Sequence, residues 1–127
     1  MNLPAENVSP QLTRNRRLII VIGVVIPLVI TMGAAFVMAL WIPELPNPVA
    51  SHWGTSGPDG YSTVGSVIAL PLLITLVFAA VTAFASWRGA PHGGMLWVHK
   101  FLIATSVFLA VLISVIAAGS LAVQRGV

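Results

Sequence analysis

The sequence predicts an all-α integral membrane protein, with three transmembrane helices and an ordered extracytoplasmic loop between the first and the second. Of its 127 residues, 57% are hydrophobic and only 7% are charged, whereas roughly a quarter of the residues of a soluble domain are charged. The apolar residues also fall into three runs, at about 18–42, 67–87 and 97–123. Each run has the ~20 residues that a helix needs to cross a bilayer.

The first run follows a short tail, residues 1–17, which has two prolines and ends in a basic cluster. We expect this tail to be disordered and cytoplasmic, and residues 18–127 to form a single membrane domain. A cleaved signal peptide is the alternative, but its apolar region would span only ~7–15 residues, so we expect the run to stay in the membrane. Pro27 inside the run predicts a kink, because proline has no N–H to donate to the preceding turn.

The second run should begin with Ser62 or Ser66 as its helix cap, and Pro71 fits best in its first turns. Residues 88–94, RGAPHGG, predict a tight connector to the third run. Near the start of that run, His99 and Lys100 should lie in the headgroup region.

The positive charges predict the orientation. Five cations lie on one side of the predicted spans and only Arg125 lies on the other; the five are Arg14, Arg16, Arg17, Arg88 and Lys100. Loops rich in Lys and Arg stay in the cytoplasm. We therefore expect a multi-pass protein of the bacterial plasma membrane with a cytoplasmic N-terminus, an extracytoplasmic C-terminus and the loop 43–66 outside.

Small residues recur at every fourth position of the spans, which predicts faces where helix backbones approach closely, within the chain or between copies. The candidates in the first and third spans are Gly23, Thr31, Ala35, Ser106, Ala110, Ser114 and Ala118.

The loop has the pattern of a small hairpin. Pro43, Pro46 and Pro48 should stiffen its start into an extended path. Residues 49–53 alternate as a strand does, residues 56–60 (SGPDG) favour a turn with Pro58 and Asp59 at its centre, and residues 61–64 could return as the second strand.

The loop also resembles a known family. Its sequence LPNPVASHWGTSGPDGY looks like the signature of a bacterial membrane domain of unknown function that occurs at the N-terminus of SdpI-type immunity proteins. The matching positions are Leu45, Pro46, His52, Trp53, Gly57, Pro58, Asp59, Gly60, Tyr61 and, beyond the loop, Pro71. Ala50 stands where that family often has Pro, and Gly54 where Asn is common, so His52 lacks this polar neighbour. In those proteins the domain precedes further helices, and the whole protects a cell from a secreted peptide toxin and signals its presence.

The resemblance and the turn chemistry together select the candidate recognition residues, His52, Trp53, Pro58, Asp59, Gly60 and Tyr61. In the simpler interpretation, Asp59 bonds to the backbone of its own turn and His52 packs beside Trp53. A pH-sensing role for His52 is a less favoured alternative.

Other chemistry finds little support in the sequence. The chain has no cysteine. A zinc site needs at least three protein ligands, and His92 and His99 should lie across the membrane from His52, so we expect no metal and no cofactor. The loop glycines lack the lysine and helix of a phosphate-binding loop. No base and acid accompany the loop serines, so no catalytic residue is predicted.

We therefore expect a non-enzymatic membrane protein with an outward-facing recognition loop. The alternative is an accessory or structural subunit of a membrane complex or transporter, docked through the stripe from Ser106 to Ala122. The bilayer is the first expected partner. Further candidates are another membrane protein, an extracellular peptide or a second copy of the chain, and nucleic acid is not expected because membrane orientation explains the basic cluster.

Overall fold

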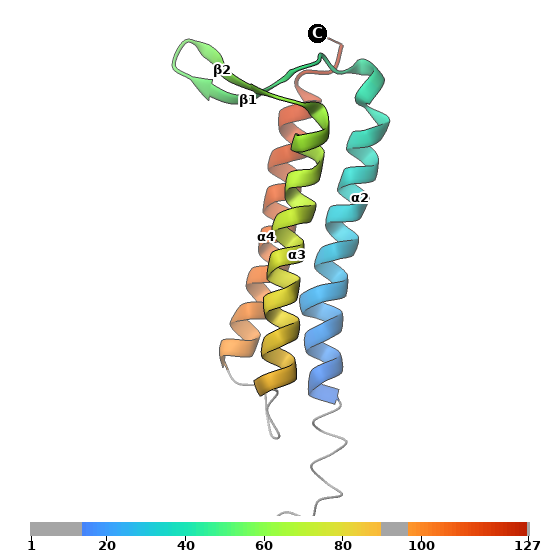
Figure 1. The fold of residues 1–127 in the computed structure, drawn as a ribbon, viewed down its shortest axis with the longest axis vertical. Helices are drawn as coiled ribbons and strands as arrows, with labels where there is room; N and C mark the ends of the chain where they lie inside the picture. Colours follow the sequence, from blue (N-terminus) through green and yellow to red (C-terminus); the bar gives the residue numbers. More distant parts are fainter. Residues whose placement is uncertain (1–13, 90–96, 127) are drawn as a thin grey trace, which may run out of the picture.

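The computed structural model of the protein describes residues 14–89 and 97–126, and consists of three long helices with a small β-hairpin at one end (Figure 1). The first span, Arg14–Leu40, contains a π-turn, η1 (Val21–Val25), followed by α2 (Ile26–Leu40). A 3-10 turn, η2 (Ile42–Glu44), leads to the strands β1 (Val49–Gly54) and β2 (Gly57–Ser62). The chain then continues through α3 (Val64–Gly89) and α4 (Trp97–Ala122). All three helices are long and apolar enough to cross a membrane, which makes this a multi-pass membrane protein.

The predicted spans are present, with shifted ends. Residues 14–17, expected in the disordered tail, are helical, and the second span begins at Val64 rather than near residue 67. The rest of the tail (1–13) and most of the predicted connector, including His92, lie outside the described residues. The all-α prediction also needs an amendment, because the loop contains a two-stranded antiparallel sheet.

The start of α3 corrects the predicted cap. Neither Ser62 nor Ser66 is the capping residue; the Thr63 hydroxyl accepts the backbone N–H of Ser66 at 3.3 Å. The Ser66 hydroxyl in turn donates to the Thr63 carbonyl at 2.8 Å. The first of these contacts satisfies one of the N–H groups that the first helical turn leaves without a partner, and Thr63 is the single residue between β2 and α3.

The first span accommodates Pro27 by widening the turn before it. In η1 the Ile26 N–H donates to the Val21 carbonyl, five residues back, as in the π-bulges that interrupt many helices. The Pro27 carbonyl is used as well, because the Thr31 hydroxyl donates to it at 3.2 Å. The irregularity predicted at this proline is therefore a π-turn.

The kinds of side chain buried inside the bundle differ between its two ends. At the hairpin end, Met38, Val49, Val64 and Leu121 form the hydrophobic core, with Trp41, Leu45, Ile68 and Ala117 among the residues packed against it. Farther from the hairpin, Ile19 is a buried large apolar residue, and many of the other buried residues are polar; they include Thr31, Thr75, Thr82, Ser86, His99, Ser106 and Ser114. Thr82 and Ser106 hydrogen-bond across α3 and α4 at 3.3 Å, the kind of contact that replaces the missing hydrophobic drive in lipid.

The predicted packing residues take up positions of two kinds. Gly23, Thr31, Ser106, Ala110 and Ser114 are buried within the chain, whereas Ala35 and Ala118 are half-buried. The α4 stripe thus contacts the chain's own helices over most of its length, so these buried positions offer no free face to a partner.

Gly23 lies where the first span and α3 approach each other closely. A Cβ built on Gly23 would lie 2.7 Å from Thr82 Cγ2, whereas one built on Gly33 has nothing within 4 Å. We expect Gly23→Ala to lower the free energy of unfolding in mixed micelles by about 1–3 kcal/mol, because Thr82 is β-branched and cannot easily rotate away. The matched variant Gly33→Ala should be neutral or slightly stabilising. Equal stabilities of the two variants would contradict this packing.

Candidate functional site

The hairpin turns at Thr55 and Ser56, and not at Pro58 and Asp59 as the sequence suggested. Gly54 pairs with Gly57 across the turn, and residues 58–60 belong to β2. The positive φ falls on Gly57, at 114°, a conformation that glycine adopts without strain. Pro58 can lie in β2 because the sheet has only two strands, and proline is tolerated at a sheet edge.

The start of β1 is held against the end of α4. Val49 and Ala50 are buried. The Gln124 side chain acts as a neighbouring strand would: its Oε1 accepts the Ala50 N–H at 2.7 Å, and its Nε2 donates to the Ala50 carbonyl at 2.9 Å. The same Nε2 donates to the Ser120 carbonyl at 2.9 Å, which fixes the side chain on its own helix. Gln124 therefore anchors the hairpin.

A second contact joins η2 to the residues after α4. Arg125 Nε donates to Glu44 Oε2 at 2.8 Å, and the Gly126 N–H donates to the Glu44 carbonyl at 2.9 Å. The hydrogen bond from Arg125 is the main cause that lowers the pKa of Glu44, and the same bond raises the pKa of Arg125. The guanidinium also lies 4.8 Å from the centre of the Trp41 ring, within the range of a cation–π contact.

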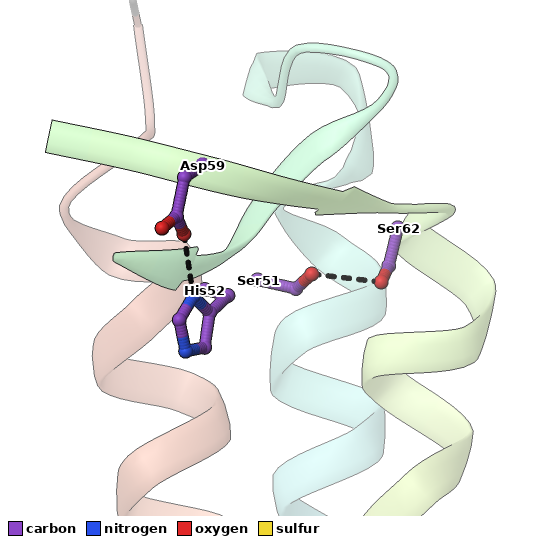
Figure 2. Close-up of polar contacts among 4 residues, drawn as sticks. All are labelled: Ser51, His52, Asp59 and Ser62. Atoms are coloured by element: carbon purple, nitrogen blue, oxygen red, sulfur yellow. Dashed lines mark hydrogen bonds and ion pairs between the residues drawn. The ribbon is translucent and has the colours of Figure 1, made fainter. Parts of the chain in front are cut away.

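Across the hairpin, His52 and Asp59 form a side-chain pair between Nδ1 and Oδ1 (Figure 2). Both side chains are mostly exposed, at 74% and 54%. A carboxylate on one ring nitrogen fixes the orientation of an imidazole and leaves the other nitrogen available. The structure differs from the simpler interpretation of Asp59, which lies in β2 outside the turn and pairs with His52.

Two glycines make room for this pair. A Cβ on Gly54 would lie 2.5 Å from Asp59 Oδ2, and a Cβ on Gly60 would lie 2.8 Å from His52 Cβ. A residue with a side chain at position 54 would therefore require the Asp59 carboxylate to move. The polar neighbour that the sequence seemed to lack is supplied by Asp59 from the opposite strand.

The remaining candidate recognition residues lie on the same hairpin. Trp53 and Tyr61 are exposed, and so is Pro58, while Gly60 is half-buried beside His52. The hairpin thus presents two aromatic rings and one oriented imidazole close together in the register, since His52 pairs with Gly60 and Trp53 with Pro58.

The four side chains drawn in Figure 2 do not form a catalytic triad. The Ser51 hydroxyl accepts a hydrogen bond from Ser62 at 2.8 Å and is not paired with His52. Over residues 14–89 and 97–126, no group of three or more metal-ligating side chains comes together.

The sequence-based predictions include neither the Gln124–Ala50 contact nor the Arg125–Glu44 contact. One signal was available. Glu44 and Arg125 were both expected on the outer side, and two opposite charges at the ends of adjacent spans are candidates for an ion pair. No comparable pattern reveals the Gln124 contact, because it depends on the exact position of β1.

Comparisons with known proteins add no further information on the site. No family model, no curated protein and no solved structure matches the chain.

The two hydrogen bonds between the Gln124 side chain and Ala50 predict a localised effect of one substitution. Gln124→Leu removes both hydrogen bonds to Ala50 while keeping an apolar stem, and an unpaired, partly buried backbone group costs about 1–3 kcal/mol. We expect hydrogen exchange of the Ala50 amide to become about tenfold faster or more, since ~1.4 kcal/mol corresponds to a factor of ten. The control Val123→Leu, at an exposed neighbouring position, should leave it unchanged. If the Ala50 amide of Gln124→Leu exchanged as slowly as in the wild type, the Gln124 hydrogen bonds would not be what holds β1.

Proposed function

We propose that this chain is a non-enzymatic membrane protein that recognises a partner through its hairpin. The observation that carries the proposal is the contrast between the two ends of that hairpin. The end of the hairpin next to the helices, which we call its root, is held by hydrogen bonds from Gln124 and by the burial of Val49 and Ala50. Its outer half displays Trp53 and the His52–Asp59 pair to solvent, and Tyr61, opposite Ala50 in the register, is exposed beside them.

Such a surface suits binding. Tyrosine and tryptophan supply large contact areas with few rotatable bonds, and they dominate many binding sites. The His52 ring, oriented by Asp59, adds a directional polar group. Because a fastened root restricts the backbone before a partner arrives, less conformational entropy would be lost on binding.

The partner class that we favour is a secreted peptide. The resemblance of the loop to the N-terminal domain of SdpI-type immunity proteins supports this choice, and with it a role in immunity or signalling at the bacterial plasma membrane. The accessory-subunit alternative is less attractive, because Ser106, Ala110 and Ser114 of its proposed interface are buried within the chain.

We also propose that the hairpin is extracytoplasmic. The support comes from charge: Arg14, Arg16 and Arg17 lie at the end of the bundle away from the hairpin (Figure 1), as does Lys100 near the start of α4. Cytoplasmic loops carry the excess of Lys and Arg.

The absence of cysteine allows a direct test of this orientation. We expect Ser56→Cys, in the exposed turn, to react with a membrane-impermeant maleimide in intact cells. Trp97→Cys, at the exposed start of α4, should react only after the membrane is permeabilised. The reverse pattern would place the hairpin in the cytoplasm.

The recognition role predicts that His52 and Asp59 act as a unit. In cells that depend on this chain for survival of a peptide toxin or of envelope stress, His52→Ala and Asp59→Ala should each reduce survival to the level of cells lacking it. The double variant should be no worse than either single variant, because each removes the same contact. Ser56→Ala, in the turn, is the matched control and should behave as wild type.

Membrane insertion of all four variants is checked by their abundance in the membrane fraction. Full survival of both single variants, at normal abundance, would reduce the hairpin to a connector between spans.

A further inference from the structure

A groove lies between α3 and α4, directly beside the hairpin root. Its volume is about 320 Å³. The α3 side is formed by Ser66, Val67, Leu70, Pro71 and Ile74, the α4 side by Ile113, Ile116, Ala117 and Ser120, and the hairpin contributes Ser51 and Ser62. We call this the α3–α4 groove.

The groove is polar at one end and apolar at the other. Its four serines gather where the helices meet the hairpin: two on the strands, Ser66 in the first turn of α3 and Ser120 in the last turn of α4. Ile74 lies eight residues along α3 from Ser66, and Ile113 lies seven residues before Ser120. At 1.5 Å per residue these offsets correspond to about 10–12 Å of depth. No charged side chain lines the groove among the described residues.

The change from a polar to an apolar lining matches the change from headgroups to hydrocarbon in a bilayer. The serines lie at the end of the spans, where the hydrocarbon core gives way to the headgroup region, and the isoleucines lie deeper in the hydrocarbon. Leu70 and Ile116 line the groove and are also 56% and 61% exposed. Since the outer surface of a transmembrane bundle faces lipid tails, the groove communicates with the bilayer along this rim.

At the polar end, the hydroxyls of the two strand serines leave one donor available to a ligand. Ser62 donates to Ser51, and Ser66 donates to the Thr63 carbonyl. The Ser51 hydroxyl accepts from Ser62 and retains its own hydrogen for donation. A ligand at this end therefore needs a hydrogen-bond acceptor, and the neutral lining requires no charge on it.

We propose that the α3–α4 groove binds one acyl chain of a glycerolipid, with the ester carbonyl of that chain accepting the hydrogen bond of Ser51. The volume agrees, because a methylene is about the size of a water molecule, and at ~30 Å³ each the groove holds on the order of ten such groups. An acyl chain matches the gradient from an ester to pure hydrocarbon. This inference requires only that the chain spans a membrane, and it does not depend on the recognition role.

A peptide fits the groove less well than a lipid does. A helical peptide with side chains is about 10–12 Å wide, too wide for this volume. An extended peptide would bring backbone N–H and C=O groups beside Leu70 and Ile116, where the lining offers no partners and each unpaired group is costly in lipid.

The test uses the full chain in phosphatidylcholine vesicles that contain a small fraction of phosphatidylcholine with a diazirine on one acyl chain. After irradiation, mass spectrometry locates the lipid adducts. We expect adducts on residues 70–74 and 113–117 to be several-fold more abundant than those at Phe36, an equally lipid-exposed residue of α2.

A pair of neighbouring substitutions separates the groove from the general lipid surface. Ile116 and Val115 are 61% and 64% exposed, and only Ile116 lines the groove. Ile116→Trp should fill the groove and reduce the adducts on residues 70–74 to the level at Phe36. Val115→Trp should leave them unchanged.

Two results would overturn the proposal. Equal labelling of the groove and Phe36 would mean that lipid merely surrounds the bundle. A groove that stays unlabelled while Phe36 is labelled would show that lipid does not enter it, and would leave a peptide or a second protein as the occupant. Thermal unfolding of both tryptophan variants, expected to be alike, confirms that the comparison is made between folded proteins.

Discussion

The hairpin depends on one side chain that behaves as a piece of backbone. The carboxamide of Gln124 has the same donor and acceptor as a peptide group, and it pairs with both polar groups of Ala50. A two-stranded sheet by itself is only marginally stable in water. Here the amide extends the ladder beyond β1, and the burial of Val49 and Ala50 adds apolar contact. The position of the hairpin therefore depends on a contact made by the residue two places after α4.

The three spans are held together by interactions different from those that hold the hairpin. Lipid tails are as apolar as the side chains they surround, so burying leucine between spans yields little. The structure instead brings backbones close together at Gly23 and joins Thr82 to Ser106. Apolar packing is concentrated at the hairpin end, around Met38 and Leu121. This is where the loop folds back onto the bundle, and where a hydrophobic cluster can exclude water.

Sequence reasoning predicted the three spans and a hairpin because both depend on local patterns: length of apolar runs, alternation and turn residues. It misplaced the turn, since Pro58-Asp59-Gly60 has the composition of a turn yet lies in β2. The pairing register of the two strands determines where the turn lies, and the turn propensity of these three residues does not. It also missed the His52–Asp59 pair and the α3–α4 groove. The pair follows from the cross-strand register, and the groove follows from the way two antiparallel helices meet.

The short joint between β2 and α3 has a mechanical consequence. Only Thr63 separates Ser62 from Val64, and its capping contacts with Ser66 leave no slack there. A displacement of the hairpin tip would therefore be passed to α3 through this joint, while the Gln124 hydrogen bonds keep the start of β1 beside the end of α4. The α3–α4 groove lies at the same joint, because Ser62 and Ser66, on either side of Thr63, both line it.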